Sequence, residues 1–291
     1  MPGFLSSLRR RLKAWRFTRP RFVNLGRYSV AINRDGRMIF MMTEDLSLTP
    51  SLALYGVWEQ RVVSALHRLL RPGDLVVEGG ANIGCHTLVM AEAIGPSGRL
   101  YAFEPLPDLF PLLELNLRLT NSKRYAQVEL RNLALLDHEG PIEMLLDPLF
   151  FGSGHLAIPN ASHRYSRRIS AQSTTIDAAL IEEGARPVSL IRLDIEGSEI
   201  LALRGAEETI RRSPSLKIVM EWSPIMLRSR SNPVEGAAWL SSLGFRFWSI
   251  ERSAWRSAPQ TSTWRNYREP SRPLKAKVPR DLNGQTDKNG R

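Results

Sequence analysis

Cysteine, long apolar runs and the common metal and phosphate signatures are what this sequence lacks. Its single cysteine, Cys85, excludes an intramolecular disulfide and fits a reducing compartment. No run approaches the ~18 apolar residues of a membrane span, and the first residues do not resemble a secretory signal. There is no Cys/His cluster with zinc spacing, no G-x-x-x-x-G-K-[ST] loop and no G-x-S-x-G turn. We therefore expect a cytoplasmic protein without a bound metal, a P-loop or a serine-hydrolase site.

Positive charge is abundant but is confined to the two ends of the chain. Residues 1–37 carry ten Lys/Arg against one Asp, residues 252–291 carry ten against three acids, and the residues between carry 20 against 25. The net charge of +11 therefore belongs to two basic arms around an acidic body. The 43% hydrophobic composition of the whole chain predicts a globular core. A non-catalytic nucleic-acid-binding protein that uses these arms is one interpretation. The acidic body and the lack of a known nucleic-acid motif count against it, so we expect no specific nucleic-acid partner.

The chain is organised around residues 73–104. This stretch contains, in order, a strand at 75–77, a glycine turn at 79–84, a helix at 85–94 and a second strand at 100–103. Each apolar strand ends on a carboxylate, Glu78 and then Glu104, as buried parallel strands do when they reach the carboxyl edge of a sheet. The unit predicts a nucleotide or nucleoside site, with Glu104 accepting hydrogen bonds from a ribose diol.

The glycine turn leaves two classes of ligand open. A dinucleotide site needs G-x-G-x-x-G, but Ala81 stands where the second glycine would meet the pyrophosphate. The other register, E-x-G-x-N-x-G from Glu78 to Gly84, suits a ligand without phosphates, such as S-adenosylmethionine. A nicotinamide-dependent oxidoreductase is thus the alternative enzyme, and Ala81 counts against it.

Four motifs also resemble those of the FkbM family of S-adenosylmethionine-dependent methyltransferases. They are Glu78–Gly84, Tyr101–Pro105, Asn132–Leu135, and Leu190–Glu199 followed by Leu203–Ala206. The resemblance covers roughly residues 55–221, with Glu78 in place of the more usual Asp and Arg192 in place of Lys. It implies a Rossmann-like class I α/β fold, with a doubly wound, mostly parallel sheet and a small N-terminal cap.

The resemblance also implies the cofactor, the reaction and the residues that serve them. The cofactor would be S-adenosylmethionine, and the reaction O-methylation of a hydroxyl on a sugar or another biosynthetic product, so the partner is a small-molecule or glycan acceptor. The residues assigned to the cofactor are Glu78, Gly80, Asn82, Ile83, Gly84, Glu104, Asn132 and Ala134.

Three residues are candidates for catalysis. Asp194 follows a buried strand at 189–193 and should face the crevice near the transferable methyl. His155 lies in a predicted loop at 147–173, and a histidine titrating near ~6.5 can accept a hydroxyl proton at neutral pH. Either could be the base, and Glu196 would orient the acceptor or the cofactor. Glu59 is interpreted mainly as a solvated helix carboxylate.

The rest of the pattern predicts alternating strands and helices. Strands are expected at 28–32, 38–40, 128–135, 140–146, 216–221, 245–250 and 261–267, and helices at 58–70, 105–120, 198–212 and 232–243.

We divide the chain into four parts on this basis. They are a basic arm at 1–37, a cap at 38–72, a methyltransferase domain at 73–268 and a disordered basic tail at 269–291. Within residues 1–21, apolar side chains from Phe4 to Trp15 share one helical face among arginines. This segment is either an interfacial helix that contacts anionic membrane or a flexible arm.

Overall fold

The computed structural model describes residues 21–120, 123–157 and 167–250. The predictions for the helix at 1–21, the strand at 261–267 and the tail at 269–291 concern residues that lie almost wholly outside these ranges. The chain divides into two units, one that ends at Pro233 and one that starts at Val234. None of the described helices is both long and apolar enough to cross a bilayer.

The centre of the first unit is a parallel sheet of five strands, ordered β12-β11-β4-β5-β6. Its strands are β4 (Leu75–Gly79), β5 (Arg99–Phe103), β6 (Gln127–Arg131), β11 (Leu190–Leu193) and β12 (Lys217–Met220). Every residue of β4 and β11 is buried, which explains why both read as unbroken apolar runs. The predicted doubly wound, parallel sheet is confirmed.

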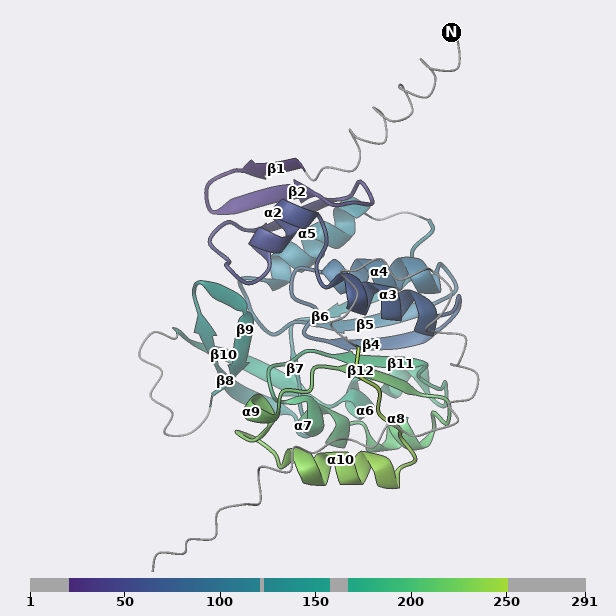
Figure 1. Ribbon diagram of the computed structural model, residues 1–291. Helices are drawn as coiled ribbons and strands as arrows, with labels where there is room; N and C mark the ends of the chain where they lie inside the picture. Colours follow the sequence, from purple (N-terminus) through teal and green to yellow (C-terminus); the bar gives the residue numbers. More distant parts are fainter. Residues whose placement is uncertain (1–20, 121–122, 158–166, 251–291) are drawn as a thin grey trace, which may run out of the picture. The chain divides into compact units, whose positions relative to one another are not determined.

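Helices lie on both faces of this sheet (Figure 1). One face carries α3 (Gln60–Leu69), α4 (Cys85–Ile94) and α5 (Phe110–Thr120), and the other carries α6 (Ile176–Ala179), α7 (Glu199–Arg204) and α8 (Glu207–Arg211). A 3-10 turn at Ile181–Glu183 follows α6, and a short helix, α9 (Pro224–Leu227), follows β12. Leu66 of α3 and Met90 of α4 pack on Val76 and Leu100 in one buried cluster. The helix predicted at 58–70 thus packs on α4, the helix that follows the glycine turn.

The N-terminal cap is a three-stranded antiparallel sheet followed by a short helix. It comprises β1 (Arg21–Asn24), β2 (Tyr28–Ile32), β3 (Met38–Met42) and α2 (Thr49–Tyr55). The predicted strand pair is confirmed, and β1 extends it. Asn33 shapes the turn between β2 and β3, because its Oδ1 accepts hydrogen bonds from the main-chain N–H groups of Asp35 and Arg37.

The predicted loop at 147–173 is wrong over most of its length. Residues on both sides of the undescribed segment form strands of a four-stranded sheet, ordered β7-β10-β8-β9. The strands are β7 (Ala134–Leu135), β8 (Gly140–Asp147), β9 (Phe150–Leu156) and β10 (Arg167–Thr174). Composition hid them, because Gly152, Ser153 and Gly154 interrupt the alternation of β9, while Phe151 and Ile169 are buried.

Three further predictions need correction. The strand expected at 128–135 is broken after β6, because the chain leaves the parallel sheet and joins the other sheet as β7. The helix expected at 198–212 is broken at Gly205, where a Cβ would lie 2.2 Å from the carbonyl oxygen of Leu136. In the second unit, α10 (Pro233–Ser242) forms as expected, but residues 245–250 form no strand. An alternating pattern is not sufficient, since a strand also needs a partner for its hydrogen bonds.

Candidate functional site

A cavity of about 400 Å³ opens at the carboxyl edge of β4, β5 and β11. Its lining combines the glycine turn, the ends of these strands, part of the cap and the β8–β9 hairpin. Ligands of open α/β sheets bind at this edge, and cavities of roughly 300–1,000 Å³ hold small ligands. We therefore take this cavity as the candidate active site.

The main-chain N–H groups of the glycine turn are already hydrogen-bonded within the protein. Those of Gly80 and Ala81 donate to the carbonyl of Phe103, and that of Gly84 donates to Ala81, all at 2.9–3.0 Å. The N–H groups of Asn82 and Ile83 donate to side-chain oxygens of Glu104 and Asn82. A pyrophosphate site needs such groups to point at the ligand. The turn therefore disfavours a dinucleotide.

Glu104 is held rigidly at the end of β5. One carboxylate oxygen accepts the N–H of Asn82 at 2.8 Å and the other accepts the N–H of Leu106 at 2.9 Å. Burial raises the pKa of Glu104 to about 7, against the lowering effect of these two bonds. Each oxygen can still accept another hydrogen bond, as a ribose diol would require.

Gly80 allows the turn to approach the end of β11 closely. Its φ is +76°, and a Cβ would lie 2.0 Å from the carbonyl oxygen of Asp194. No side chain fits this position. The glycine thus lets the turn pack closely against the main chain of Asp194, the residue predicted to be catalytic.

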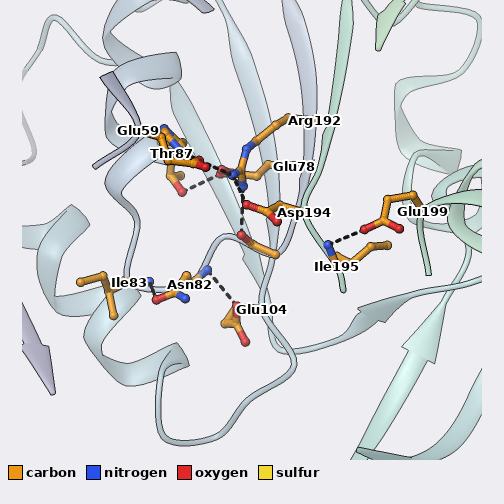
Figure 2. Close-up of polar contacts among 12 residues, drawn as sticks. Glu59, Glu78, Asn82, Ile83, Thr87, Glu104, Arg192, Asp194, Ile195 and Glu199 are labelled. Atoms are coloured by element: carbon orange, nitrogen blue, oxygen red, sulfur yellow. Dashed lines mark hydrogen bonds and ion pairs between the residues drawn. The ribbon is translucent and has the colours of Figure 1, made fainter. Parts of the chain in front are cut away.

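A buried guanidinium connects the turn to the neighbouring acids, as Figure 2 shows. Arg192 donates to Oδ2 of Asp194 at 2.6 Å and to the carbonyl of Gly80 at 3.1 Å, and it lies 3.4 Å from Oε1 of Glu78. Glu78 also accepts the hydroxyl of Thr87 at 2.6 Å. Burial raises the pKa of Glu78 to about 7, although Arg192 opposes the shift. The planar guanidinium of Arg192 contacts several partners at once. A lysine ammonium would do this with less directionality.

Glu59 joins this cluster from the cap. It precedes α3 with φ +43°, and its Oε2 lies 2.9 Å from Nε2 of His86 and 3.8 Å from Arg192. Burial lowers the pKa of His86, and Arg192 lowers it further. The bonds to His86 and the charge of Arg192 lower the pKa of Glu59 despite burial. The side chain of Glu59 is 38% exposed, so it is partly solvated as expected, but it is also bonded to His86.

Three carboxylates gather where β11 and β12 end. Asp194, Glu196 and Glu221 offer oxygens that lie within 4.8 Å of one another. Burial raises the pKa of Glu196 to about 8, and the charge of Glu221 adds to the shift. The pKa of Glu221 rises to about 7, again mainly through burial. Such a group could hold a divalent cation, although acidic groups are common without one.

Another part of the cavity lining is apolar and comes largely from the β8–β9 hairpin. Ile142 and Met144 of β8, Phe150 and Phe151 of β9, and Trp58 of the cap line it. Phe151 is buried in the core, whereas Phe150 is 42% exposed. This wall can pack against a non-polar face of an acceptor.

The structure brings most, but not all, of the predicted site residues to the cavity. Gly80, Asn82, Glu104, Ala134, Asp194 and Glu196 are among its lining residues. Glu78, Ile83 and Gly84 lie behind the lining, and a Cβ at Gly84 would meet Leu113 of α5 at 2.9 Å. Asn132 supports the end of β5 instead, because its Nδ2 donates to the carbonyl of Glu104 at 2.8 Å.

His155 is placed differently from the expectation. It lies on β9, and its Nδ1 is 2.8 Å from the carbonyl oxygen of Ser153. Gly154 and Leu156 line the cavity, whereas His155 between them does not. The structure therefore gives no support for His155 as a residue of the cavity wall.

Sequence reasoning missed His86, Glu221 and the apolar wall, and it named Glu59 mainly as a solvated helix carboxylate. Glu221 follows β12 directly, so the rule that identified Asp194 at the end of β11 could also have found it. No short-range signal links Glu59 to His86, which are 27 residues apart. Cys85 also lines the cavity, and burial raises the pKa of its thiol to about 12.

Comparison with known proteins shows that this chain matches one protein family. Residues 78–247 match the model of the methyltransferase FkbM domain, which is more than half of the chain. The chain is 22% identical over 185 residues to methyltransferase sdnD of Sordaria araneosa, with 55% of this chain and 70% of that protein covered. It is 46% identical over 48 residues to the protein-L-isoaspartate O-methyltransferase of Methanothrix thermoacetophila, with 16% and 23% covered.

The chain is also similar to solved structures at low identity. Fibrillarin of Aeropyrum pernix, in complex with S-adenosyl-L-methionine, is 15% identical with a TM-score of 0.33, and the match covers 75% of this chain and 90% of that one. The tRNA m1G37 methyltransferase of M. jannaschii is 16% identical with a TM-score of 0.26, and 38% and 31% are covered.

Proposed function

Because the chain belongs to the FkbM methyltransferase family, it uses S-adenosylmethionine as methyl donor, and we propose that the acceptor is a hydroxyl group of a sugar or of another biosynthetic product. The cavity volume of about 400 Å³ suits the cofactor. Glu104 would hold the ribose, and the glycine turn, whose N–H groups are occupied, would support a ligand without phosphates. When bound, S-adenosylmethionine supplies a methyl group that its sulfonium makes electrophilic.

The observation that carries the proposal is the position of Asp194. Its side chain lines the cavity, is 33% exposed and is fixed by Arg192 through Oδ2. Oδ1 would then accept the proton of the acceptor hydroxyl as the new O–CH3 bond forms and the S–CH3 bond of the sulfonium breaks, with S-adenosylhomocysteine as the leaving group. A carboxylate is a weak base, but the proton of the hydroxyl becomes more acidic as its oxygen is alkylated. The proton therefore need only leave late in the reaction. Of the two predicted bases, Asp194 is favoured over His155.

Glu196 would orient the acceptor. With a pKa of about 8, raised by burial and by the charge of Glu221, it is largely protonated at neutral pH and can donate a hydrogen bond as well as accept one. A polyhydroxylated acceptor offers partners for both actions, and the apolar wall would cover its non-polar face.

The test is methyl transfer from labelled S-adenosylmethionine to a panel of hydroxylated, carboxylated and amine acceptors. We expect label in an ether, which survives mild base that hydrolyses a methyl ester. Asp194→Asn should lower turnover by roughly 10²–10⁴-fold, while calorimetry shows unchanged cofactor binding. Asp137→Asn, outside the cavity lining, is the matched control, and His155→Ala should retain turnover.

Three outcomes would contradict parts of this proposal. Label found only in esters or amines would overturn the hydroxyl acceptor. Full turnover by Asp194→Asn with the cofactor bound would remove Asp194 as the base. Loss of turnover after chelation, restored by a divalent cation, would assign the three carboxylates to a metal instead.

A further inference from the structure

Glu196 lines the cavity in a main-chain conformation that residues other than glycine seldom adopt. Its φ is +53°, and Gly197 follows with a φ of +95°. A residue in this left-handed region carries strain, and it stays there only where the surrounding structure holds it. The position of the Glu196 side chain in the cavity therefore depends on the groups that fix this turn.

Two side chains fix the turn through its main-chain groups. Glu199 is 1% exposed, and its Oε1 accepts the N–H groups of Ile195 at 3.0 Å and of Gly197 at 3.3 Å. Arg230 donates through Nη1 to the carbonyl of Glu196 at 3.0 Å. The packing is close, because a Cβ on Gly197 would lie 2.8 Å from Nη1 of Arg230.

The same guanidinium also holds one end of the β8–β9 hairpin. Nη2 of Arg230 donates to the carbonyl of Leu156 at 2.6 Å. Leu156 is the last residue of β9 and pairs with Met144 of β8, and both line the cavity. Arg230 follows α9 and is not itself a lining residue. It thus connects the turn that carries Glu196 to the hairpin that supplies the apolar part of the lining.

The bonds of Arg230 favour this bridging over direct binding of a ligand. Nη1 also donates to Oγ of Ser229 at 2.6 Å, so both terminal nitrogens already have acceptors within the protein. A guanidinium donates in fixed directions from a planar fork, which allows one side chain to hold two carbonyls at a set spacing.

We propose that Arg230 is a positioning residue for the methyl acceptor, because it fixes Glu196 relative to the end of β9. It acts through Glu196 and Leu156 and does not touch the acceptor. Without its two bonds the strained turn and the hairpin lose their fixed spacing, and an acceptor held by both is bound and aligned less well. The inference rests on the proposed assignment of Glu196 and the hairpin to the acceptor.

The first test is kinetic and uses whichever acceptor the panel above identifies. Arg230→Met removes both bonds but keeps an extended side chain. It should lower kcat/KM for the acceptor by roughly 10²-fold, mainly through KM, with unchanged affinity for S-adenosylmethionine by calorimetry. Arg230→Lys keeps the charge without the fork, so it should restore only part of the loss. Arg228→Met, at an exposed arginine of the same segment, is the matched control and should behave like wild type.

The second test, hydrogen exchange of main-chain N–H groups, needs no acceptor. In Arg230→Met, residues 195–199 and 150–157 should exchange faster than in wild type, whereas residues 75–94 should not change. This result, together with transfer to an amine or a carboxylate, would overturn the hydroxyl acceptor but keep the role of Arg230.

Four results would overturn the role of Arg230 itself. They are unchanged exchange in both segments, wild-type kcat/KM despite faster exchange, wild-type kinetics of Arg230→Lys, and an equal loss of cofactor affinity. Thermal melts verify that each variant is folded at the assay temperature.

Discussion

The two walls of the cavity are built from different kinds of sheet. The wall assigned to the cofactor comes from parallel strands, and its polar groups are bonded before any ligand arrives: Glu104 accepts two N–H groups and Arg192 holds Asp194. The wall assigned to the acceptor comes from the β8–β9 hairpin and is mainly apolar, with Phe150 partly exposed. The first wall is preorganised for one ligand, whereas the second can admit different acceptors through changes in single side chains.

The largest effect is expected on cofactor affinity, at Gly80, where the glycine turn packs closely against Asp194. Gly80→Ala should lower affinity for S-adenosylmethionine by at least about 100-fold, because its Cβ would meet the carbonyl of Asp194 at 2.0 Å. Isothermal calorimetry measures this loss. Gly36→Ala is the matched control, since Gly36 has a similar φ of +82° but nothing within 4 Å of a Cβ. Both variants carry about 1–2 kcal/mol of backbone strain, so only the clash separates them.

Cofactor binding by Gly80→Ala at the wild-type level would contradict the preorganised wall. Equal losses in the two glycine variants would mean that destabilisation alone, and not the close approach to Asp194, weakens binding.

The contrast between the walls also explains what the sequence could predict. β4 and β5 are buried on both faces, so their apolar runs, the following glycine turn and Glu104 were visible from local pattern. β8 was also expected, at 140–146, but β9 and β10 were not, because Gly152 and Gly154 break the alternation of β9 and β10 lies in a separate segment of the chain. The contact of Glu59 with His86 depends on how α3 packs on α4, which no short window of sequence contains.

An effect of intermediate size is expected on KM for the acceptor when Phe150 of the acceptor wall is replaced. Phe150→Ala should raise KM for the acceptor about tenfold, because a side chain of this size contributes roughly 1.5–3 kcal/mol when an acceptor covers it. Affinity for S-adenosylmethionine should not change. Leu149→Ala is the control, because Leu149 is 47% exposed next to Phe150 but does not line the cavity. Steady-state kinetics with the acceptor found above, together with calorimetry, separate the two ligands. A change in cofactor affinity alone would reverse the assignment of the walls.

The smallest effect is expected on the pH dependence of stability. It concerns Glu196, which lines the cavity. Its pKa is about 8 in the folded protein, raised first by burial and then by Glu221, Asp194 and Glu199, against an ordinary value of 4.5. A raised carboxyl pKa means that the folded state keeps a proton that the unfolded state releases, so stability falls as pH rises from about 4.5 through about 8. Glu196→Gln cannot ionise and should lose less stability over this window.

Thermal melts between pH 5 and pH 9 test this difference. At pH 5 the variant and the wild type should melt at similar temperatures, and at pH 9 the variant should melt roughly 2–4 °C higher. Glu44→Gln, at an exposed glutamate of the cap, should follow the wild type at every pH. Parallel curves for Glu196→Gln and the wild type would mean that Glu196 ionises without cost in the folded protein. In that case it would be an anion at neutral pH, and its role would be restricted to accepting hydrogen bonds from the acceptor.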